Sequence, residues 1–231
     1  MDNGTGFETR EDLVFFGKIS ASISHELKNV MAIISEAAGF LEDLTKMAQE
    51  GKPLQLDMLR TCSREIMEEI DRGFDTIQQM NRFAHSVDDD VKHINLTEVV
   101  TLMIHIAGFL SISAKVRFDP PLDADLTIVT CPFRLQNLIY QAVVYAFESV
   151  GPTGEFRVGI IAQENGSMCI SFSGLGTKSL RQFPADETSK MAVTIGAEIR
   201  LSENSRKMDI TVPKRMESWE HALSQTAVPP D

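Results

Sequence analysis

Two long segments near the start of the chain carry apolar residues at the spacing of an amphipathic helix. In the first segment, from about Glu11 to Glu50, the steps between apolar residues are mostly four and three: Ile19, Ile23, Leu27, Val30, Ile34, Ala37, Leu41 and Leu44. Such steps keep one stripe of a helix facing a core. The second segment, from about Pro53 to His85, follows the turn signal Gly51-Lys52-Pro53. Together they predict an antiparallel helix hairpin, which a second copy would close into a four-helix bundle.

The stripe of the second helix is near-heptad as well. It is predicted to contain Leu59, Cys62, Ile66, Ile70, Gly73 or Phe74, Ile77, Met80 and Ala84. These positions are interpreted as core, and the methionines among them as core-filling side chains rather than a binding surface.

One histidine lies off the stripe of the first helix. At about 100° per residue, His25 is about 200° from Ile23, so it points away from the core and towards solvent. Glu26 and Asn29 lie about 60° apart and flank this outer face. An exposed imidazole with a carboxylate and an amide beside it, on a rigid helix, is a candidate chemical site.

After the acidic run at 88–90, the pattern changes to shorter elements. Helices are predicted at about 97–113, 132–150 and 188–195, and strands at 116–118, 126–129, 156–162, 167–172, 198–201 and 208–212. This order predicts an α+β sandwich, with one sheet covered by helices on one face. The predicted domains are a loose N-terminus (1–10), the hairpin (11–87), the sandwich (92–214) and a tail (215–231).

Charge and cysteine content narrow the possible functions. A net charge of −11 argues against nucleic-acid binding, which relies on a basic surface. The three cysteines, Cys62, Cys131 and Cys169, show no metal or redox spacing, which is typical of a reduced compartment. No apolar run approaches the roughly 20 residues of a membrane helix, and the polar start shows no signal-peptide pattern. We expect a cytoplasmic protein that does not insert into the membrane.

The run Ser24-His25-Glu26-Leu27-Lys28-Asn29 resembles the phospho-accepting box of two-component sensor histidine kinases. The hairpin that carries it resembles their dimerisation and phosphotransfer domain. The resemblance implies that His25 accepts a phosphoryl group and that Asn29 orients water for dephosphorylation of a partner. Glu26 is expected to accept a hydrogen bond from a ring nitrogen of the histidine, either directly or across the bundle. The plainer alternatives are that Glu26 pairs with a lysine of its own helix and that Asn29 is an ordinary surface amide.

The same resemblance implies partners. It implies a homodimer and docking of the receiver domains of response regulators around the histidine. Ser22 and Lys28 are the expected docking residues, since Lys28 can neutralise phosphate or meet an acidic receiver surface. The Mg²⁺ for the transfer is expected from the receiver's own aspartates, so no metal site is predicted in this chain.

Residues 94–213 resemble the GHKL-type (Bergerat) ATP-binding domain that follows the hairpin in these kinases. The segment Pro132–Ala142 resembles the helix that carries the N-box, and Met168–Gly176 resembles the strand that runs into the first glycine box. The two resemblances together cover residues 12–213.

Three departures argue against ATP binding. Gln141 stands where the family has an Asn that helps to hold Mg²⁺, and Phe172 stands where an Asp accepts a hydrogen bond from adenine. The phosphate-binding glycine loop has no counterpart in 186–193. Gly174 and Gly176 are therefore interpreted as a plain turn, and the whole as a degenerate nucleotide pocket.

The sequence thus predicts a histidine phosphotransfer protein of a phosphorelay, which carries a phosphoryl group on His25 to or from receiver aspartates without binding ATP. Two alternatives stay open. The chain is an active histidine kinase with an atypical nucleotide pocket, or it is a non-enzymatic pseudokinase scaffold that binds response regulators.

Overall fold

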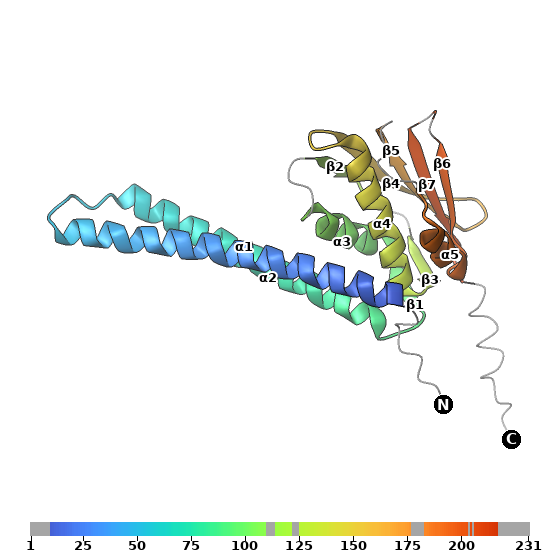
Figure 1. Cartoon of the computed structure of the whole chain (residues 1–231), viewed down its shortest axis with the longest axis horizontal. Coiled ribbons are helices and arrows are strands. Elements are labelled where there is room, and N and C mark those ends of the chain that lie inside the picture. The colour runs from blue at the N-terminus through green and yellow to red at the C-terminus, as the bar shows by residue number, and fades with distance from the viewer. Residues whose placement is uncertain are drawn as a thin grey trace, which may run out of the picture. The chain divides into compact units, whose positions relative to one another are not determined.

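The computed structural model divides the chain into two compact units (Figure 1), each described by itself. One unit is Leu13–Ala84, and the other contains the chain from His85 onwards. The structure describes residues 10–109, 114–121, 125–176, 183–202, 204 and 206–216. The predicted loose start (1–9) and the tail beyond Met216 lie outside the described residues.

The first unit is a helix hairpin. Helix α1 (Arg10–Gln49) and helix α2 (Leu56–Ala84) are joined by a short turn in which Gly51 has a φ of 86°, a left-handed conformation that favours glycine. Ile19, Ile23 and Val30 have no exposed surface, so the predicted stripe of α1 faces the interior. None of the described helices combines the length and the apolar character that a bilayer crossing requires.

The buried face of α2 differs from the prediction. Its fully buried residues are Cys62, Gly73, Thr76 and Phe83. Of the two alternatives Gly73 and Phe74, Gly73 is the buried one. Phe74, Ile77 and Met80 are at least 40% exposed in the single chain. The reason is the close approach of the helices at Gly73, where an added Cβ would lie 3.3 Å from Cγ1 of Val30. Gly73 therefore faces α1, and Phe74, about 100° further round the helix, does not.

The second unit is an α+β sandwich, as predicted. In chain order it contains η1 (His85–Val87), β1 (Lys92–Asn95), α3 (Leu96–Gly108), β2 (Lys115–Phe118), β3 (Thr127–Thr130), α4 (Pro132–Val150), β4 (Glu155–Ala162), β5 (Met168–Ser173), α5 (Asp186–Thr194), β6 (Glu198–Ser202) and β7 (Lys207–Val212). The main sheet has the order β2-β4-β5-β7-β6, with β2 parallel to β4 and the other pairs antiparallel.

The strands form two sheets rather than the single sheet predicted. β1 and β3 pair antiparallel in a separate two-stranded sheet, with Ile94 opposite Ile128. β1 has one buried residue, too few for an alternating pattern to reveal it. The chain after β7 adds to β3: the Val129 N–H donates to the Lys214 carbonyl and the Met216 N–H to the Val129 carbonyl. The first residues of the predicted tail are thus paired.

The core of the sandwich lies between the main sheet and α4 and α5. Along β4, β5 and β7 every second side chain is buried: Phe156, Val158, Ile160, Met168, Ile170, Phe172, Met208, Ile210 and Val212. This period of two places them on one face of the sheet. Helix α4, which begins at Pro132, covers that face, and its buried residues include Leu138, Ile139, Ala142, Val143 and Ala146.

Candidate functional site

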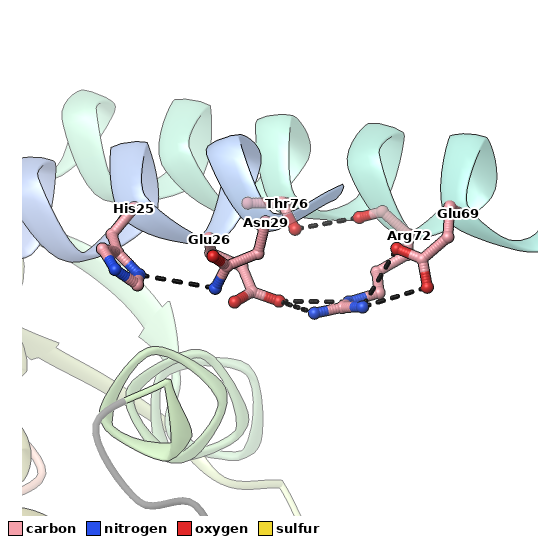
Figure 2. Close-up of polar contacts among 6 residues, drawn as sticks. All are labelled: His25, Glu26, Asn29, Glu69, Arg72 and Thr76. Carbon is pink, nitrogen blue, oxygen red and sulfur yellow. Dashed lines mark hydrogen bonds and ion pairs between the residues drawn. The ribbon is translucent and has the colours of Figure 1, made fainter. Parts of the chain in front are cut away.

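The candidate histidine lies on the outer side of α1, as its helical position predicts. His25 is exposed, whereas Ile23 and Glu26 on either side of it are buried. The side-chain nitrogen Nδ2 of Asn29, one turn further along, lies 3.4 Å from Nδ1 of His25 (Figure 2). The amide that the sequence predicted as a flanking group therefore contacts the imidazole and can fix its orientation.

Glu26 does not flank the outer face as expected, since only 8% of its surface is exposed. Its carboxylate oxygen Oε1 accepts hydrogen bonds from Nε of Arg72, at 3.0 Å, and from the terminal nitrogen NH2 of the same residue. Within one chain, the Glu26 carboxylate thus forms an ion pair between α1 and α2 (Figure 2) and not the direct hydrogen bond with His25 that was one of the two expected arrangements.

A second carboxylate completes this cluster. The NH1 group of Arg72 donates to both oxygens of Glu69, at 3.1 and 3.0 Å. The hydrogen bonds to Glu26, helped by the negative charges of both carboxylates, raise the pKa of Arg72 above its ordinary value although partial burial opposes the rise. Thr76 donates its hydroxyl hydrogen to the Arg72 carbonyl oxygen at 2.8 Å. We call Glu26, Arg72 and Glu69 the carboxylate–arginine cluster.

The two predicted docking residues lie in different surroundings. Lys28 is exposed on α1, where a partner can reach it. Ser22 is half-buried, and its hydroxyl oxygen is enclosed with no hydrogen-bond partner among the described residues. Lys28 is therefore the better placed of the two for a contact with another protein.

The hairpin exposes apolar side chains on two faces. The histidine face carries Ile33 and Phe40, which lie on the same side of the buried stripe of α1 as Asn29. Met31 of α1 lies on the opposite face. On α2, Arg72 reaches Glu26 on the histidine side, and the exposed apolar residues Met67, Phe74 and Ile77 lie about 140–160° round the helix from Arg72, so we assign them to the opposite face. Met31 is about 100° from Val30 in one direction and Asn29 about 100° in the other, so the two faces are distinct.

In the second unit, Phe172 fills the position that the resemblance assigns to an adenine-binding Asp. Its side chain has no exposed surface. Its ring stacks on Phe156 with centroids 6.5 Å apart, and Phe156 in turn makes an edge contact with Phe147 at 5.0 Å. The three rings come from β5, β4 and α4, so Phe172 joins the strands to the helix as a core residue.

The glycines after Phe172 are held by structural contacts. Gly174 has a φ of 81°, and the Gly176 N–H donates to the Ser149 hydroxyl oxygen at 3.2 Å. A Cβ on Gly176 would lie 1.6 Å from the Ser149 carbonyl oxygen, so only glycine fits there. The Leu175 N–H donates to the Arg206 carbonyl at 3.1 Å. These two hydrogen bonds fix Leu175 and Gly176 against the β6–β7 turn and the end of α4, respectively.

Gln141 also makes a contact within the fold. Its Nε2 lies 3.4 Å from Oδ1 of Asn137, one turn earlier on α4. One turn later, Tyr145 stacks on Phe183 with centroids 4.8 Å apart. Sequence reasoning did not identify this aromatic pair, because its members are far apart in the chain.

The sequence matches no protein-family model. It is 24% identical over 171 residues to the sensor histidine kinase ZraS of Klebsiella oxytoca, a match that covers 72% of this chain and 35% of ZraS. Among solved structures it is similar to the mycobacterial sensor histidine kinase MprB (TM-score 0.45, 11% identity, 54% of this chain and 98% of that chain). It is also similar to histidine kinase ThkA in complex with the response regulator protein TrrA (TM-score 0.38, 18% identity, 89% and 64%).

Proposed function

We propose that this chain, a histidine-kinase-like domain of two-component signal transduction, is a histidine phosphotransfer protein that is charged by a receiver domain and not by ATP. The observation that carries the proposal is the contrast between the two units. His25 is exposed on a rigid helix, with Asn29 against its ring. Phe172, in contrast, is a core residue at the position where the family's nucleotide pocket needs a carboxylate.

The chemistry requires little beyond the histidine itself. A ring nitrogen of neutral His25 attacks the phosphorus of a receiver aspartyl phosphate, so that a P–N bond forms and the P–O bond to the aspartate breaks. The carboxylate leaves, and the reverse reaction discharges His25. The Mg²⁺ that neutralises the phosphoryl oxygens belongs to the receiver. On this proposal the contact with Asn29 holds the ring in the orientation that the attack needs.

The two exposed faces of the hairpin suit two different partners. On the opposite face, Phe74 is 62% exposed and Met31 is 56% exposed. Burying such side chains against a second copy gains about 1.5–3 kcal/mol each. Dimerisation there leaves the histidine face open. On the histidine face, Ile33 and Phe40 offer apolar contacts to a receiver that brings its aspartate to His25.

The proposal is tested by incubating the protein with a receiver domain that carries labelled phosphate on its aspartate. The wild type should acquire label and His25→Ala should not. Equal labelling of the two proteins would refute the role of His25. Receiver binding that is unchanged by His25→Ala, with no transfer in either direction, would favour a scaffold instead. Micromolar binding of ATP with Mg²⁺ in calorimetry, followed by label on His25, would favour a kinase.

A further inference from the structure

The arginine of the carboxylate–arginine cluster lies beside the histidine without contacting it. Arg72 reaches across from α2 and bonds Glu26 of α1 on one side and Glu69 of its own helix on the other. The side chains of Glu26 and Glu69 are 10% and 17% exposed, so both carboxylates are largely removed from water. One cation therefore compensates two poorly solvated negative charges.

The position of these charges matters for any phosphoryl chemistry at His25. Glu26 follows His25 directly in the sequence, and Figure 2 shows His25, Asn29 and the Glu26–Arg72 pair in one row along the histidine face. A phosphoryl group that arrives at the imidazole brings about two negative charges. Charges in a partly buried site are screened less than in water, so uncompensated carboxylates here would oppose its arrival.

We propose that Arg72 is a positioning residue for phosphoryl transfer at His25. It holds the Glu26 carboxylate away from the imidazole and neutralises Glu26 and Glu69, so that a dianionic phosphoryl group can reach and remain on the ring. This inference rests on the proposed role of His25 as a phosphoryl carrier and adds an electrostatic requirement that lies on the second helix.

The geometry explains why the residue is an arginine. The planar guanidinium presents donors along separate edges, and Arg72 uses Nε and NH2 for Glu26 and NH1 for Glu69. A lysine has one ammonium at the end of a flexible stem and cannot match both carboxylates in this fork. Arg72→Lys should therefore retain only part of the function, because it preserves the charge and loses the bridging geometry.

The test measures phosphorylation of His25 by potassium phosphoramidate, a small donor that needs no partner protein. In this reaction the P–N bond to ammonia breaks, the P–N bond to the imidazole forms, and ammonia leaves. We expect Arg72→Gln to lower the labelling rate about tenfold, because the Glu26 and Glu69 carboxylates would then repel the negatively charged phosphoryl group without a cation to neutralise them. Arg72→Lys should fall between Arg72→Gln and the wild type. Arg60→Gln is the matched control, because Arg60 is an exposed arginine of the same helix; it should label at the wild-type rate.

The double variant Glu26→Gln/Arg72→Gln separates electrostatics from folding. It removes the Glu26 charge, which is next to His25 in the sequence, and leaves only the Glu69 charge without its cation, so labelling should recover to within about threefold of the wild type. A purely structural role of the ion pair predicts no such recovery, since the pair is broken in both variants. Wild-type labelling in Arg72→Gln, or a double variant as slow as the single one, would overturn the inference. Should Arg72→Gln fail to fold, Arg72→Lys and the double variant carry the same comparison.

The same experiment distinguishes this inference from the proposed function. If phosphoramidate labels His25 with the expected dependence on Arg72 but no receiver exchanges phosphate with it, the proposed partner is wrong and the inference holds. If a receiver charges the wild type and Arg72→Gln equally well, the proposed function holds and the inference is wrong.

Discussion

The ring of Phe172 gives a quantitative test of how the second unit is built. Truncation of a fully buried phenylalanine to alanine typically costs about 3–5 kcal/mol. Phe172 has no exposed surface and also stacks on Phe156, so Phe172→Ala should lie in that range. Phe172→Asp, which introduces the carboxylate that the resemblance leads one to expect at this position, adds the burial of a charged group, which costs on the order of several kcal/mol more. Its total cost thus becomes comparable with the whole stability of a domain, about 5–15 kcal/mol.

The assay is urea unfolding followed by far-ultraviolet circular dichroism, together with calorimetric titration of each folded variant with ATP and Mg²⁺. Ile161→Thr is the control, because Ile161 is 58% exposed on β4 of the same sheet. Its stability should stay within about 0.5 kcal/mol of the wild type. A Phe172→Asp variant that folds as stably as the wild type and binds ATP would show that this position belongs to a working nucleotide pocket, and would refute the reasoning.

Three further predictions concern packing and charge. Gly73→Leu should destabilise the hairpin by about 1–3 kcal/mol in thermal unfolding, because a Cβ there already lies 3.3 Å from Val30; unchanged stability would contradict this. A hydrogen bond from Lys214 helps to lower the pKa of Asp125 to about 2, so the pair stabilises the fold above the unfolded pKa of about 3.9 and loses this effect as the pH falls towards 2. A carboxyl NMR titration with a midpoint near 3.9 would disprove it. Burial raises the pKa of Cys169, so Ellman's reagent should modify this thiol much more slowly in the native protein than in urea; equal rates would count against its burial.

The orientation of His25 could be predicted from the sequence because it depends on local periodicity. The spacing of Ile19, Ile23 and Val30 determines which side of α1 is buried, and the histidine falls on the other side whatever α1 packs against. On α2 the same reasoning left Gly73 and Phe74 as alternatives and placed Ile77 on the stripe, whereas the single hairpin buries Gly73 and leaves Phe74 and Ile77 exposed. Their positions depend on the small size of Gly73, which lets the two helices approach closely at that point.

The carboxylate–arginine cluster could not be predicted in the same way. Glu26 and Arg72 are 46 positions apart, and the sequence alone fixes neither the register of the hairpin nor the rotation of α2. From the sequence alone, Glu26 was predicted to pair with His25 or with a lysine of its own helix. The structure pairs it with a cation of α2, whose guanidinium can bridge two carboxylates.

In the second unit, too, some features could be predicted from the sequence and others could not. The sequence alone showed that Phe172 stands where the resemblance leads one to expect an Asp. The supporting stack on Phe156 and the pairing of Tyr145 with Phe183 are tertiary contacts that no local pattern reports. The short strand β1 was also missed, because four residues with one buried side chain carry no periodicity.

The central claim is that His25 receives its phosphoryl group from another protein. It is tested most directly by side-by-side labelling of the wild type with radiolabelled ATP and Mg²⁺ alone, and with a receiver domain that carries labelled aspartyl phosphate. We expect label to appear on the protein only with the phosphorylated receiver and to be lost in His25→Ala. Label on His25 from ATP alone would contradict it, because the chain would then phosphorylate itself.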